Sequence, residues 1–132
     1  MAFDAEHLEK MMSGIKCFNS QHYWECHEEL EHVWLEDRQD PHRYVYWALI
    51  QVAAAMVHYR EGKLIGAQGM INKAREKFRK CRELHILSPL LEDRLQWSEF
   101  EALVNAVPEK AEDLRPFEPI WNFRFKHYVG ME

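Results

Sequence analysis

The sequence predicts an all-α fold: a compact helical bundle of about five helices, with an extended aromatic C-terminal tail. The chain of 132 residues holds only five glycines and five prolines, and these helix breakers fall between stretches with the helical period of 3.6 residues. Apolar residues make up 47% of the chain and aromatic residues 13%. This is enough apolar surface for one core, so we treat residues 1–132 as a single helical domain.

The first two helices are predicted from amphipathic stretches at residues 5–18 and 21–36. Asn19 and Ser20 stand between them, and their short polar side chains favour the position that caps the start of a helix.

A third helix is predicted at residues 41–60. Asp40 is a suitable cap, and Pro41 fits the first helical position, where the missing N–H costs nothing. Gly62 follows in a short turn, where a left-handed backbone conformation would end the helix.

The fourth helix is predicted at residues 63–82. A fifth should begin at Ser88 and Pro89, after the break "HILSP", and fade near Asn105.

The tail differs in composition, because residues 107–125 contain three prolines and four aromatic residues. A short helical turn at 109–114 would fit the sequence there. Beyond it we expect an extended chain that lays four apolar side chains on the bundle: Phe117, Ile120, Trp121 and Phe123.

The stretch "YWECHEELEHVW" at 23–34 concentrates ionisable groups between two tryptophans. At about 100° per residue, His27 falls inside the most apolar stripe of its helix. Glu28 and Glu31 fall between Trp24 and Leu35, so we expect both carboxylates to be at least partly buried.

The third helix is apolar on nearly every side, which indicates a central helix surrounded by others. Its polar exceptions lie on one stripe with Trp47 and Ala54, and an unpaired buried polar group costs roughly 1–3 kcal/mol. They therefore need partners, and the short connection makes the second helix the nearest source. The expected polar network consists of His27, Glu28, Glu31, Arg43, Gln51 and His58.

Two interpretations of this network stay open. In the first it is structural: Arg43 pairs with a carboxylate, and Gln51 and His58 bridge the helices. The aromatic residues around it would form core or line an apolar pocket for a small-molecule ligand: Tyr23, Trp24, Trp34 and Trp47.

The second interpretation is a site for a divalent transition metal, zinc or ferrous iron. His27, Glu31 and His58 would be the ligands, and Glu28 would be the catalytic general base. The stretch "HEELE" lacks the second histidine of the HExxH zinc motif, so the strong form of this signal is missing.

The remaining ionisable candidates carry weaker signals. The three cysteines form no CxxC pair and predict a reducing, cytoplasmic compartment.

The net charge of −5 argues against nucleic acid as a partner, and no apolar run is long enough to span a membrane. The other histidines are expected at the surface: His7, His22, His42, His85 and His127.

The stretches "FNSQHYWECHEELEHVWL" and "YWALIQVAAAMVHYREGKLIGA" resemble the family catalogued as domain of unknown function 309. The shared pattern covers about residues 18–78, and Ala48 departs from it, since the family usually carries glycine there. The resemblance implies an all-helical fold and brings no established activity. The matching positions are Phe18, Asn19, Tyr23, His27, Glu28, Glu31, Trp34, Leu49, Ile50, Gln51, Ala53, His58, Gly62, Gly66 and Ala67.

The sequence thus predicts a non-catalytic binding or interaction module, with a metal-dependent, hydrolase-like enzyme as the alternative. A protein partner or a homo-oligomer formed through exposed aromatic residues of the tail is a further expectation.

Overall fold

The computed structural model describes residues 2–126 and confirms the all-α fold over that range. His127, predicted at the surface, lies outside the described residues. The helices are α1 (Ala5–Asn19), α2 (Tyr23–Glu36), α3 (Arg43–Arg60), α4 (Leu64–Glu83), α5 (Pro89–Leu95), α6 (Trp97–Asn105), the 3₁₀ turn η1 (Arg115–Phe117) and α7 (Glu118–Trp121).

The first four helices agree with the expected ones to within about two residues at each end. The Asp4 carboxylate caps α1 by accepting the backbone N–H of His7 at 3.0 Å. The Asp40 carboxylate accepts the N–H of His42 at 2.8 Å, which holds a turn ahead of α3. Gly62 has a φ of 73°, as predicted for a residue that ends a helix.

The expected fifth helix is in fact two helices, α5 and α6. Gln96 stands between them with a φ of 46°, in the left-handed region. Its backbone N–H still bonds to the carbonyl of Glu92 at 3.1 Å. One residue in this conformation changes the direction of the helix axis. The apolar period of the sequence runs on across Gln96, so it gave no sign of the break.

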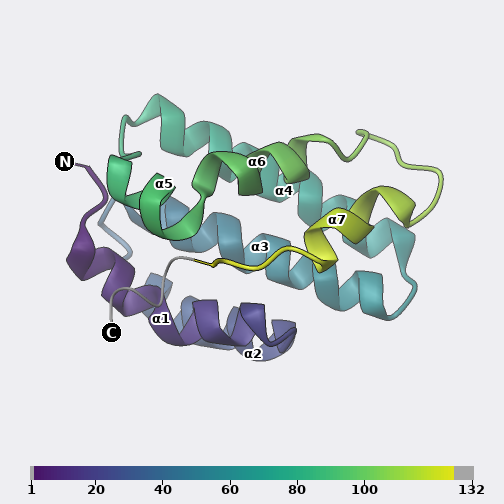
Figure 1. Ribbon diagram of the computed structural model, residues 1–132, viewed down its shortest axis with the longest axis horizontal. Coiled ribbons are helices and arrows are strands. Elements are labelled where there is room, and N and C mark those ends of the chain that lie inside the picture. The colour runs from purple at the N-terminus through teal and green to yellow at the C-terminus, as the bar shows by residue number, and fades with distance from the viewer. Residues whose placement is uncertain (1, 127–132) are drawn as a thin grey trace.

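Figure 1 shows α3 between α2 and α4, with α1, α5, α6, α7 and the tail in front of them. The helices α2, α3 and α4 form one layer, and the remaining segments cover one side of it. None of the helices among residues 2–126 is long and apolar enough to cross a membrane.

The tail is more helical than expected, because η1 and α7 occupy residues 115–121. Its aromatic side chains are not exposed: Phe117, Phe123 and Phe125 are buried in the core, and Trp121 is part-buried. The end of the tail crosses α3 (Figure 1) and packs on helices from both layers. Its ring contacts run from Phe125 to Phe18 of α1, from Trp121 to Tyr23 of α2 and Tyr59 of α3, and from Phe123 to Phe100 of α6.

The two sides of α3 differ in burial. Leu49, Val52 and Met56 are fully buried beneath the covering segments. At 100° per residue the opposite stripe carries Trp47, Gln51, Ala54 and His58, which are only part-buried. The polar stripe of α3 therefore lies on the uncovered side of the layer rather than inside the bundle.

Candidate functional site

The predicted polar residues of α2 lie at the edge of this uncovered side. Glu28 and Glu31 are exposed, with 53% of the Glu31 side chain accessible, so the expectation of burial was wrong. The buried face of α2 carries Tyr23, Cys26 and Leu30. Residues of α2 that face neither α1, α3 nor the tail are exposed to solvent, Glu28 and Glu31 among them.

His27 is the part-buried member of this edge. Its ring stacks on Trp24, with ring centroids 5.0 Å apart and an interplanar angle of 10°. Its Nε2 lies 3.8 Å from the Glu31 carboxylate, one helical turn away. Both of these side chains belong to the predicted polar network.

Arg43 has other partners than the expected carboxylate of α2. Its guanidinium donates to the carbonyl oxygen of Asp40 at 3.3 Å and lies 4.9 Å from the centre of the Tyr44 ring. Arg43 therefore contacts residues near the start of α3 in place of the expected glutamate of α2.

Four polar atoms of part-buried side chains on this side are themselves buried and have no hydrogen-bond partner in the described part of the chain. They come from adjacent helices of the layer: His27 Nδ1, Trp34 Nε1, Gln51 Oε1 and His58 Nδ1. A bridge from Gln51 or His58 to α2 is therefore not formed here, and the residues that share the stripe do not make a satisfied network.

The three predicted metal ligands do not come together. His27, Glu31 and His58 do not offer ligand atoms that all lie within 4.8 Å of one another. His58 instead lies against Gly66 at the start of α4, where a Cβ would stand 2.4 Å from its Nδ1. A metal role for these residues, with Glu28 as base, would require a different arrangement of their side chains.

Three of the four predicted pocket aromatics lie on the uncovered side, and Tyr23 is core. The Trp47 ring contacts Trp34 of α2 at 5.0 Å, and the Lys77 ammonium of α4 lies 4.4 Å from the centre of a Trp47 ring. Trp24 is 52% exposed.

We call this side the outer face. It comprises Trp24, His27, Glu28, Glu31, Trp34 and Leu35 of α2, Trp47, Gln51, Ala54 and His58 of α3, and Gly66, Lys73, Lys77 and Lys80 of α4.

Two shallow cavities border the outer face. One, of about 240 Å³, lies beside Trp47 and Lys77. The other, of about 620 Å³, lies beside His58 and Gly66 and is lined mostly by apolar atoms, including those of Ile65. Both are open hollows at the α3–α4 seam.

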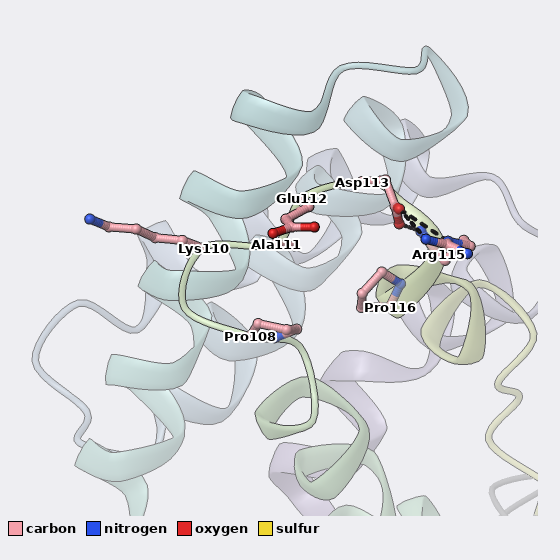
Figure 2. Close-up of a pocket in the computed structure, with 7 residues that line it drawn as sticks. All are labelled: Pro108, Lys110, Ala111, Glu112, Asp113, Arg115 and Pro116. Carbon is pink, nitrogen blue, oxygen red and sulfur yellow. Dashed lines mark hydrogen bonds and ion pairs between the residues drawn. The ribbon is translucent and has the colours of Figure 1, made fainter.

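A further hollow of about 690 Å³ lies in the loop that follows α6, at residues 108–116. Figure 2 shows Asp113 and Arg115 turned toward each other there, while Lys110 extends away. The Asp113 and Arg115 side chains form an ion pair at 2.6 Å. An ion pair between exposed side chains of this kind contributes little to stability.

A second polar cluster joins the start of α1 to the loop before α3. His7 Nε2 lies 2.8 Å from one oxygen of Asp40, and His42 Nδ1 lies 2.5 Å from the other. The His7 Nδ1 lies 2.6 Å from the Asp4 carboxylate. The expectation that both histidines are surface residues was wrong for His42, which is only 6% exposed, and His7 is also largely covered.

The hydrogen bonds of this cluster shift its ionisation. Burial alone would raise the pKa of Asp40, but hydrogen bonds from His7 and from the backbone and ring of His42 outweigh it and lower that pKa to about 2. Burial alone would lower the pKa of His7, but its hydrogen bonds to Asp40 and Asp4 outweigh it and raise that pKa. The geometry therefore stabilises an ionised carboxylate between two imidazoles.

Sequence reasoning missed this cluster because its members are far apart along the chain. His7 and Asp40 are 33 positions apart, and no short motif joins them. The available signal was local: Asp40 two residues before His42, and Asp4 three residues before His7.

The comparisons with known proteins agree with the sequence-based resemblance. The family model described as "Domain of unknown function (DUF309)" matches residues 11–70. This range begins earlier and ends earlier than the expected 18–78. No curated protein and no solved structure matches the chain. From α1 to the middle of α4, the chain resembles the domain of unknown function 309 family.

Proposed function

We propose that this chain is a non-catalytic interaction module, and that it associates with a second copy of itself through the outer face. The observation that carries the proposal is the combination of exposed apolar side chains with opposite charges along the two edges of this face.

The apolar part of the argument rests on Trp24 and Leu35 of α2. They are 52% and 47% exposed and stand near opposite ends of α2. Half-buried Trp34, which precedes Leu35 in the sequence, contacts Trp47 of α3. Aromatic residues are enriched in the buried centres of protein interfaces. A partner that covers this face would remove these rings from water.

The charges favour a second copy as that partner. Glu28 and Glu31 lie along α2, whereas Lys73, Lys77 and Lys80 lie along α4, and α3 runs between the two. In a face-to-face pair with its twofold axis parallel to α3, each acidic edge meets the basic edge of the other copy.

The register of the helices supports one specific contact. Trp34 and Lys77 both contact Trp47, so they stand at the same level along α3. Both α2 and α4 are joined to α3 by short turns and run antiparallel to it. Glu31 lies about one turn before Trp34, and Lys73 one turn before Lys77. Glu31 of one copy therefore faces Lys73 of the second copy.

Sedimentation velocity over a range of concentrations tests this arrangement. We expect reversible dimerisation that weakens in Glu31→Lys and in Lys73→Glu, because each change places like charges opposite each other. The double variant Glu31→Lys/Lys73→Glu should regain association, since the swapped pair is again complementary.

The matched control is Glu112→Lys, which changes the same charge on the exposed loop after α6 and should leave association unchanged. A monomer at every concentration would refute the proposal. Failure of the double variant to recover would refute this register.

A further inference from the structure

We propose that His7, Asp40 and His42 form a binding site for a divalent transition-metal ion, with Asp4 holding His7 in place. The site lies outside the outer face and does not depend on self-association. The proposal rests on ligand type, on the spacing of the ligand atoms and on the hydrogen bond behind one ligand.

The spacing of the ligand atoms is already close to that of a metal site. His7 Nε2 and His42 Nδ1 lie 2.8 and 2.5 Å from the two oxygens of Asp40, and the three ligand atoms all lie within 4.8 Å of one another. In a tetrahedral zinc site with bonds of about 2.0–2.1 Å, neighbouring ligand atoms stand about 3.3 Å apart. Replacing the bridging protons by a metal therefore needs only small outward movements.

The three ligands are held in place before any metal arrives. The imidazole rings of His7 and His42 lie 4.2 Å apart, inclined at 34°. Asp40 accepts the backbone N–H of His42, and its own carbonyl accepts the N–H of Arg43 at 3.1 Å. Buried Phe3 packs on the His7 ring at 5.3 Å and covers the cluster on one side.

Asp4 supplies the feature that distinguishes a metal site from a chance group of polar residues. Its carboxylate lies 2.6 Å from His7 Nδ1 and also accepts the backbone N–H of the same residue. Histidines that bind metals commonly donate the second ring N–H to a carboxylate, which fixes the tautomer and leaves the other nitrogen to coordinate. Here that arrangement leaves His7 Nε2 as the ligand atom.

The ligand set selects the class of ion. Two imidazoles and one carboxylate suit zinc and neighbouring transition metals, whereas calcium and magnesium prefer oxygen ligands alone. Three protein ligands leave one coordination position of a tetrahedral ion for water or for a further ligand. A bound ion would fasten the first turn of α1 to the start of α3.

The test uses the full chain, freed of metal with a chelator and then titrated with Zn²⁺ alone by calorimetry. The wild type should bind one ion, and Co²⁺ bound in its place should give the visible absorption of a tetrahedral site. Added Zn²⁺ should also raise the melting temperature, because it binds only the folded chain.

Variants locate the site. His7→Ala should abolish binding, and Asp4→Asn should weaken it about 10- to 100-fold, the usual effect of removing a carboxylate behind a metal-binding histidine. His32→Ala is the matched control: His32 is an exposed α2 histidine that approaches Glu36, and its loss should change nothing. Circular dichroism of each metal-free variant separates lost binding from lost folding. Asp4→Asn keeps all three proposed ligands, so a partial loss of affinity there reports on the hydrogen bond to His7.

Three results would overturn the proposal. The first is a wild type that binds no Zn²⁺, and the second is equal affinity in the wild type and a folded His7→Ala. The third is binding lost in His58→Ala but kept in His7→Ala, which would place the ion on the outer face.

Discussion

Gly66 lies in close contact with the imidazole ring of His58, which leaves no room for a side chain. A Cβ at this position would lie 2.4 Å from Nδ1 and 2.6 Å from Cγ of His58. Because Cγ is fixed near the α3 backbone, the ring cannot move away without disturbing the seam between α3 and α4. Gly69, one turn along the same helix, would place its Cβ in open space.

These two glycines give opposite predictions for the same substitution. Gly66→Ala should lower the free energy of unfolding by about 1–3 kcal/mol, the usual cost of overpacking. Gly69→Ala should raise it by about 0.5–1 kcal/mol, because alanine favours the helix. Urea denaturation measures both. The loss in Gly66→Ala should shrink when His58 is also changed to alanine, and equal effects at the two glycines would contradict the close contact with His58.

At the scale of elements, the tail is held by a side chain of the first helix. Asn19 Nδ2 donates to the carbonyl of Phe125 at 2.8 Å, and its Oδ1 accepts the N–H of Phe125 at 2.8 Å. The amide group thus satisfies both backbone groups of a residue in an extended segment. Phe18, the preceding residue, packs its ring on Phe125 at 5.2 Å.

We expect Asn19→Ala to loosen the end of the tail. Two backbone groups would lose their partners, which should lower the free energy of unfolding by about 1–3 kcal/mol. Hydrogen exchange at the Phe125 amide should accelerate. The control is Asn122→Ala, which removes an exposed amide side chain from the same segment. Unchanged exchange at Phe125 in Asn19→Ala would mean that ring packing alone holds the tail.

At the scale of the whole molecule, one core connects both layers of helices. Cys26 of α2 and Cys81 of α4 are fully buried in it, whereas Cys17 is part-buried. Burial raises the pKa of Cys81 to about 12 and that of Cys26 higher still. A raised thiol pKa leaves almost no reactive thiolate at neutral pH.

Alkylation of the native protein at pH 8 should therefore label Cys17 first. Labelling of Cys26 and Cys81 should be slow and should follow global unfolding as urea is added. Mass spectrometry of peptides resolves the three sites, and Cys17→Ser should remove the fast phase. Rapid labelling of Cys26 or Cys81 without denaturant would show that the two layers separate locally.

Much of the fold could be predicted because its signals are local. Periodicity and the left-handed Gly62 predicted α1 to α4, since both act within a few residues of the chain. The expected caps were wrong, because His22 and His42, and not Ser20 and Asp40, stand at the starts of α2 and α3, with no capping bond from a side chain. The break at Gln96 was missed because glutamine carries no preference for the left-handed region. The burial of Glu28 and Glu31 was misjudged because a helical wheel shows which residues share a side, and not which side another helix covers.

The sequence by itself determined that this chain is helical, that α3 is central and that its polar residues share one stripe. All of these follow from short-range spacing along a helix. Only the tertiary structure decided that the stripe faces outward, and that His7 and His42 meet on the carboxylate of Asp40. Those outcomes depend on how whole helices pack, because packing brings together residues that no local pattern in the chain relates.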